Sequence, residues 1–248
     1  MQCGIVKAAA GAAALAAAAA IADAGDAAGR FAQGPEDAVV TNGVSISFAR
    51  GKWDRADFFP AKSWRWDYVG QFDQLDDAIV NKCPDLPGDQ LQKSDVYASI
   101  MYRAPVCVPC AVSSRMMFDY RMAPIVVLAD GLARNDKHDC AEFRDHWEIC
   151  LYDRGVNVWH HFFVDGVQKW EKAASLLLPE REWFKPNAVH DVRVTVARNT
   201  HGIKEMKVVV DDYQLTYVDD RIPDRFHAGI IACEGRNFFY DLRIKPQK

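Results

Sequence analysis

The 248-residue sequence has no excess of positive charge. Lys and Arg total 30 against 34 Asp and Glu, which gives a formal net charge of −4. Proteins that bind nucleic acid or anionic membranes through their overall field carry a basic excess. The composition therefore argues against a nucleic-acid partner. With 50% hydrophobic and 26% charged residues, it also excludes a disordered or collagen-like chain and predicts a globular protein.

Helical periodicity is scarce after the first two dozen residues, and no internal repeat is present. Met116 and Phe118 instead alternate with Arg115 and Asp119, and the apolar run PIVVLA at 124–129 predicts a strand covered on both faces. Turn signals recur about every 8–12 residues, which is typical of an all-β sandwich or jelly roll. Short helices are expected only around 74–80 and 170–178, and a polar loop is expected over 130–144.

The N-terminal segment differs from the rest in composition. Between Ala8 and Ala24, 13 of 17 residues are Ala. A preceding lysine, an apolar run and a small-x-small step ending at Ala24 predict a secretory signal peptide. The run has about fifteen residues, fewer than the roughly 20 that span a bilayer. We expect a signal peptide at 1–24, an N-terminal segment with the first strand at 25–50, and a sandwich at 51–248 that forms one domain with 25–50. The mature chain would be secreted or periplasmic, with no membrane contact.

Cleavage after Ala24 removes Cys3 and leaves six cysteines, namely Cys83, Cys107, Cys110, Cys140, Cys150 and Cys233. An even number in an exported chain predicts structural disulfides of undetermined connectivity. The sequence has a single CxxC, at 107–110, and a zinc site would need further ligands, for which His138 and Cys140 are weak candidates. No cofactor is expected, although the acidic loops at 73–77 and 134–140 could bind a structural calcium ion through carboxylate and carbonyl oxygens.

The segment 145–166, DHWEICLYDRGVNVWHHFFVDG, predicts a β-hairpin with its turn at Arg154-Gly155. This register buries Trp147 and Leu151, and His160 points to the same side as a structural histidine. It places Glu148 directly opposite His161 on the open face. That open face carries Arg144, His146, Glu148, Cys150, Tyr152, Asn157, Trp159, His161 and Phe163.

Several segments resemble, in their order, the concanavalin A-like lectin/glucanase superfamily, most closely bacterial exported domains of unknown or sugar-hydrolase function. The segments are WRWDYVGQ, KSDVYASIMYR, RMMFDYRM, PIVVLADG, DHWEICLYDRG, HDVRVTVARN, MKVVVDDYQL, HAGIIACEG and FFYDLRI. The resemblance runs from about Trp53 to Ile244. It implies two stacked antiparallel sheets in a jelly roll, with a concave face that holds saccharide. The family's glucanases carry a Glu-x-Asp-x-x-Glu strand, whereas this chain has EICLYD at 148–153, which departs from that pattern.

On this interpretation, Glu148 with His146 or His161 performs acid/base cleavage of a glycosidic bond, and Asp119 supplies the second carboxylate. Residues expected to bind an oligo- or polysaccharide substrate are Trp159, Arg121, Arg115, Arg144, Tyr152 and Asn157. Arginines suit an acidic sugar, because guanidinium groups bind carboxylates. If the substrate contains uronic acids, the same site could cleave it by β-elimination, and the protein would be a lyase and not a hydrolase. The alternative is a non-catalytic carbohydrate-binding module. Trp64 and Trp66 either stack on sugar or belong to the core.

Overall fold

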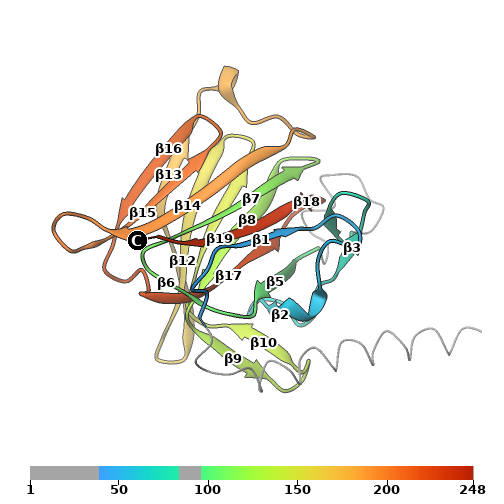
Figure 1. Cartoon of the computed structure of the whole chain (residues 1–248), viewed down its shortest axis with the longest axis horizontal. Helices are drawn as coiled ribbons and strands as arrows, with labels where there is room; N and C mark the ends of the chain where they lie inside the picture. Colours follow the sequence, from blue (N-terminus) through green and yellow to red (C-terminus); the bar gives the residue numbers. More distant parts are fainter. Residues whose placement is uncertain (1–38, 84–95, 248) are drawn as a thin grey trace, which may run out of the picture.

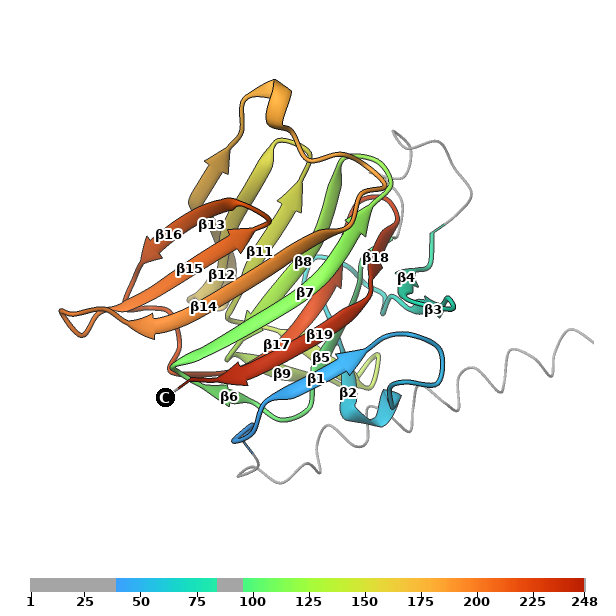
Figure 2. The same cartoon turned by 45° about the horizontal axis from the view of Figure 1, so that its top comes forward.

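The computed structural model describes residues 39–83 and 96–247 (Figure 1). The predicted signal peptide at 1–24 lies outside this range. Two curved sheets lie face to face, with β14, β7 and β19 in one and β12, β11 and β8 in the other (Figure 2). The described helices are two single 3-10 turns, η2 (Arg55–Asp57) and η3 (Glu180–Glu182). No helix in the described ranges has the length and apolar character needed to span a bilayer.

The first sheet contains nine strands in the described residues, all paired antiparallel. Their order is β16 (Tyr213–Val218), β15 (Lys204–Val210), β14 (His190–Arg198), β7 (Cys110–Phe118), β18 (Asn237–Phe239), β4 (Ile79–Asn81) and β3 (Phe72–Gln74). Strand β19 (Asp241–Pro246) also pairs with β7, and β1 (Val44–Ser47) pairs with β19.

The second sheet contains ten strands in the described residues. Their order is β13 (Val167–Leu177), β12 (Gly155–Val164), β11 (His146–Tyr152), β8 (Met122–Ala129), β17 (Arg225–Ala232), β5 (Ala98–Tyr102), β2 (Phe58–Lys62), β10 (Cys140–Phe143) and β9 (Leu132–Asn135), and β6 (Val106–Cys107) pairs with β17. Among the strands of the described residues, only the pairing of β2 with β10 is parallel. The predicted two-sheet antiparallel jelly roll is confirmed.

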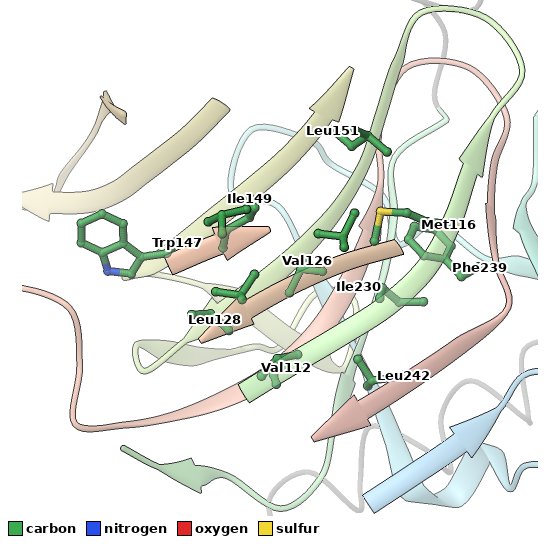
Figure 3. Close-up of a cluster of buried hydrophobic side chains, with 14 of the residues drawn as sticks. Val112, Met116, Val126, Leu128, Trp147, Ile149, Leu151, Ile230, Phe239 and Leu242 are labelled. Atoms are coloured by element: carbon green, nitrogen blue, oxygen red, sulfur yellow. The ribbon is translucent and has the colours of Figure 1, made fainter. Parts of the chain in front are cut away.

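The main core lies between the sheets (Figure 3). Val112, Met116, Phe239 and Leu242 of the first sheet face Val126, Leu128, Trp147, Ile149, Leu151 and Ile230 of the second, and all are at most 1% exposed. Each such side chain stabilises the fold by about 1.5–3 kcal/mol relative to exposure. The prediction that Trp147 and Leu151 face the core is confirmed. So is the central strand over 124–129, because β8 lies between β11 and β17.

A second hydrophobic cluster lies on the other side of the ten-stranded sheet. It joins Ile125 and Val127 of β8 to Phe59 of β2 and Phe143 of β10. Strands β2 and β10, next to the end strand β9, therefore curl over the concave face of their own sheet. The polar loop expected over 130–144 is in fact the hairpin β9–β10, in which Ala141 and Phe143 are fully buried.

The hairpin of β11 and β12 differs from its predicted register by two residues. Tyr152 pairs with Gly155, so Asp153 and Arg154 form the turn. Gly155 has φ 144°, and a Cβ there would lie 1.9 Å from the Leu176 carbonyl oxygen of β13. This glycine is thus required for close approach of a third strand, and not for the turn. Because the shift is even, every side chain keeps its predicted face.

Two other expectations are wrong. The segments 74–80 and 170–178 are not helical, since Trp170 lies in the edge strand β13, whose pairing with β12 overrides local helix propensity. The disulfide prediction also fails, because the six cysteines of the described residues are free thiols. Burial raises the pKa of Cys110 and Cys233 to about 12, so they behave as small apolar residues.

Candidate functional site

Three ionisable side chains meet on the concave face of the ten-stranded sheet. His146 and Glu148 alternate along β11, and His161 of β12 is paired directly with His146. Glu148 Oε1 lies 3.3 Å from His146 Nε2, and Glu148 Oε2 lies 3.3 Å from His161 Nε2. The two imidazoles stack with centroids 4.6 Å apart and planes within 10°. Glu148 and His161 therefore share a face as predicted, although they are diagonal neighbours and Glu148 lies opposite Trp159.

This triad of His146, Glu148 and His161 is buried, which contradicts the predicted solvent-facing position. The three residues are 3%, 5% and 3% exposed. The ring of Phe143, from the curled end of the sheet, stacks on His146 at 4.6 Å. Tyr97 is buried in the same cluster. The alternation along β11 gives the face of each side chain, but only the curl of the sheet covers it.

Burial and mutual contacts determine the charge of the triad. Burial alone would raise the pKa of Glu148, but the His161 and His146 imidazoles outweigh it and hold that pKa well below its usual value. Burial lowers the pKa of His146 more than the Glu148 carboxylate raises it. At neutral pH the site therefore contains a carboxylate beside a neutral His146.

Several buried polar atoms around the carboxylate lack a hydrogen-bond partner in the described part of the chain. They are Nδ1 of His146, Nδ1 of His161 and the hydroxyl of Tyr97. Burial, followed by the charge of Glu148, raises the pKa of Tyr97 well above its usual value, which keeps it protonated. An unpaired buried polar group costs about 1–3 kcal/mol, so a concentration of such groups is typical of functional sites.

Aromatic side chains lie on the same face beside the triad. We call Trp64, Trp159, Phe163 and Trp170 the aromatic strip. Trp159, His161 and Phe163 occupy every second position of β12 and so share one face. Trp170 of β13 lies opposite His161 and is 54% exposed. Trp64, 44% exposed, contacts Phe163 edge-on at 6.1 Å.

Cations border the aromatic strip. The Arg144 guanidinium lies 4.9 Å from the centre of the Phe163 ring, and the exposed Lys172 is paired with Trp159. Predicted binding residues Trp159 and Arg144 thus lie together. The sequence interpretation missed Trp170 because it assigned 170–178 to a helix. In a strand, Gln168, Trp170 and Lys172 lie on one face because they are two residues apart, and this spacing identifies the face of Trp170.

Tyr152 and Asn157 share the face of Glu148 but lie toward the hairpin end. Asn157 pairs with Cys150 in the register, and its Oδ1 accepts a hydrogen bond of 2.8 Å from Ser175. On this face Asn157 therefore lies one side-chain position beyond Glu148, and Tyr152 lies two positions beyond it. The prediction of their face agrees with the structure.

Arg115, Arg121 and Asp119 do not extend this face. Arg115 is on β7 of the other sheet, 2.8 Å from Asp241. Asp119 and Arg121 lie in the turn that joins β7 to β8. Glu148 pairs with Val127, five residues or about 16 Å along β8 from its first residue, Met122.

The contacts of Asp119 and Arg121 belong to that turn. Asp119 accepts a 3.0 Å hydrogen bond from the Arg236 backbone, and Arg121 contacts Asp153 at 3.8 Å. The expectation that Asp119 is the second carboxylate beside Glu148 is therefore wrong, because the chain changes sheets at this turn.

Glu234 and Arg65 approach the site without having been predicted. Glu234 is half-buried after β17, and burial raises its pKa against the opposing charges of Arg121 and Arg65. The charges of Glu148 and Glu234 both raise the pKa of Cys233, so both carboxylates lie within electrostatic range of the same thiol. Only the fold brings these loops together.

The acidic loops considered for calcium use their carboxylates in ion pairs. Asp76 contacts Arg50 at 3.1 Å, and Asp73 contacts Lys82 at 3.7 Å. In the second loop Arg134 contacts both Asp136 and Asp139.

No family model and no curated protein matches the sequence. Solved structures match in fold. β-Agarase A from Zobellia galactanivorans has a TM-score of 0.52 at 12% identity over 82% of this chain and 90% of the agarase. The κ-carrageenase from Pseudoalteromonas carrageenovora, solved with an oligotetrasaccharide of κ-carrageenan, has a TM-score of 0.50 at 12% identity over 85% of this chain and 98% of that one.

A third match is the carbohydrate recognition domain of Emp46p in its potassium-bound form, with a TM-score of 0.52 at 10% identity over 82% of this chain and 97% of that domain. These neighbours are an agarase, a carrageenase and a carbohydrate recognition domain, so they agree in architecture and differ in activity. The chain shares with them the two-sheet antiparallel jelly-roll fold.

Proposed function

We propose that this chain is an exported saccharide-binding protein, secreted or periplasmic, whose ligand lies along the aromatic strip. The observation that carries the proposal is the exposure of Trp64 and Trp170 beside Phe163 and Trp159 on one face of the sheet. Large aromatic rings are rarely left in water without a partner, and a flat indole suits the apolar face of a pyranose. The fold supports the same conclusion, since an oligosaccharide is bound by a neighbour with this architecture.

The cations around the strip indicate which saccharides to test first. Arg144 and Lys172 border the rings, and Arg65 is exposed nearby. Guanidinium groups bind carboxylate and sulfate oxygens in pairs. The first ligands to test are therefore polyuronates and sulfated galactans, with neutral glucans and agarose for comparison.

The test is affinity electrophoresis of the mature chain in gels that contain each polysaccharide. Trp170→Ala and Trp64→Ala should each weaken binding by roughly 5- to 30-fold, as expected for about 1–2 kcal/mol of lost ring contact. The control is Leu177→Ala, which also removes an exposed apolar side chain of β13. Equal retardation of all variants, or no retardation by any polysaccharide, would refute the proposal.

Cleavage of the bound saccharide is a second candidate function, favoured by one observation. Glu148 and Glu234 both lie within electrostatic range of Cys233, and their environments move their pKa values in opposite directions. Glycosidases commonly pair an ionised carboxylate with a protonated one about 5–9.5 Å away. Here Glu148 would be the base or nucleophile and Glu234 the acid.

A reducing-end assay on the retained polysaccharides tests this second candidate, with ultraviolet detection of unsaturated products to reveal a lyase. Glu148→Gln and Glu234→Gln should each lower turnover by about 10² or more while retention in the gel persists. Retention without any product identifies the chain as a binding module.

A further inference from the structure

We propose that His146, Glu148 and His161 bind a divalent first-row transition-metal ion. This site is independent of the aromatic strip, because the triad lies beneath the surface and the strip lies beside it. The donor set consists of two imidazole nitrogens and one carboxylate oxygen, and these atoms lie within 4.8 Å of one another. Two histidines and a carboxylate are a common ligand set for zinc, iron and manganese.

The first argument for a bound cation is that the Glu148 side chain is buried against two histidines and, within the described residues, forms no ion pair with a lysine or arginine. Within the described residues, its ion-pair contacts are with the two imidazoles alone, and its side chain is 7% exposed. An ionised carboxylate removed from water needs a compensating positive charge. Either a proton on an imidazole or a metal ion must provide it.

Glu142, a second buried carboxylate, shows which groups this protein places around a buried negative charge elsewhere. Its side chain is 8% exposed, and its oxygens lie 3.0 Å from Lys62 Nζ, 2.9 Å from Arg144 and 2.6 Å from Asn135. Two permanent cations and an amide therefore compensate Glu142. Glu148 has neither, although it is buried to the same degree.

The distances in the triad are the second argument. A charge-assisted N–H···O⁻ hydrogen bond is about 2.7–2.9 Å long, whereas both contacts of Glu148 measure 3.3 Å. Ligand atoms placed tetrahedrally around a metal at about 2.0–2.2 Å are separated by roughly 3.3–3.6 Å. The two contacts of Glu148, one to each carboxylate oxygen, therefore match the separation of neighbouring ligands, while the donor set as a whole, which lies within 4.8 Å, must draw together around an ion.

One adjustment accompanies binding. The imidazole planes are within 10° of parallel, so their Nε2 lone pairs run side by side. One ring must turn about χ2 for both nitrogens to face the same ion, and this torsion is broad in histidine.

The test is metal titration of the full chelator-treated chain with Mn²⁺ and with Co²⁺. Manganese is chosen because it prefers nitrogen and oxygen to the free thiols, and cobalt because thiolate ligation produces a distinct ultraviolet band. We expect one equivalent to bind and the melting temperature to rise with metal concentration. Glu148→Gln and His161→Gln should each abolish both effects.

Two controls keep the outcome interpretable. His201→Gln changes an exposed histidine, and Cys107→Ser removes the exposed thiol, so both variants should bind metal normally. If Glu148→Gln does not fold, His161→Gln provides the same comparison. Absence of binding would show that a proton supplies the countercharge and would overturn the proposal. Binding that survives in both triad variants would show that the metal binds elsewhere and would also overturn it. Trp170→Ala should bind metal normally even where saccharide binding is lost, so the two proposals fail separately.

Discussion

Replacing Glu148 with glutamine should destabilise this protein, because the carboxylate is buried and charged. Glutamine keeps the shape of the side chain but removes the negative charge and one acceptor oxygen. The Nε2 atoms of His146 and His161, each 3.3 Å from a carboxylate oxygen, then lose a long contact with a charged group. A hydrogen bond to a charged group contributes about 1.5–3 kcal/mol, partly offset by no longer burying that charge. We expect a net loss of about 1–2 kcal/mol, or roughly 2–8 °C in melting temperature.

The stability difference between the parent and Glu148→Gln should depend on pH in a defined direction. The pKa of Glu148 in the folded chain lies below the value of 4.5 for the free group, so its stabilising effect is complete above pH 4.5 and is lost as pH falls through the folded pKa. The difference between parent and Glu148→Gln should therefore be constant from pH 8 to about 5 and shrink in more acidic buffer. His146, whose pKa is lowered from 6.5, makes the parent less stable below that pH, because the unfolded chain takes up the proton first.

Urea unfolding followed by tryptophan fluorescence at pH 7 and pH 4, in chelator, measures both effects. The matched control is Glu180→Gln, since Glu180 is exposed in η3 and its replacement should change stability by less than about 0.5 kcal/mol. If Glu148→Gln equals the parent at pH 7, or if its deficit is unchanged at pH 4, the inferred charge and contacts of Glu148 are wrong.

Three further results are expected. Lys62→Met removes one cation from the buried Glu142 and should cost about 3 kcal/mol in urea unfolding, the low end for a broken buried pair because Arg144 remains; a loss under about 1 kcal/mol would contradict this. Gly70→Ala would place a Cβ 1.8 Å from the Tyr97 carbonyl oxygen, so it should lower stability by more than about 2 kcal/mol, and a normal urea midpoint would show that the loop at 63–71 can shift. Thiol titration in denaturant without reductant should find six reactive thiols in the mature chain, and native labelling should modify the exposed Cys107 first; two or fewer thiols would restore the disulfide prediction.

The sequence by itself determined the fold class and the face of each hairpin residue. Alternation has a strict period of two, so Glu148 and His161 fall on the face opposite Trp147 whether the turn lies at Arg154-Gly155 or one residue earlier. The same alternation in 114–118 predicted a strand with one buried face, the continuous apolar run at 124–129 predicted a strand covered on both faces, and both are present.

Only the tertiary structure decided what covers each face and which distant residues meet there. The pairing partner of a strand is a long-range property, so no local pattern showed that β7 belongs to the other sheet and takes Arg115 away from Glu148. In the same way, the parallel pairing of β2 with β10 curls the sheet over its own concave side and buries a triad that alternation alone placed in solvent. Register along a strand is encoded by neighbours in sequence, whereas burial depends on segments about 80 residues apart, such as Lys62 and Glu142, that are brought into contact by the closure of the whole sheet.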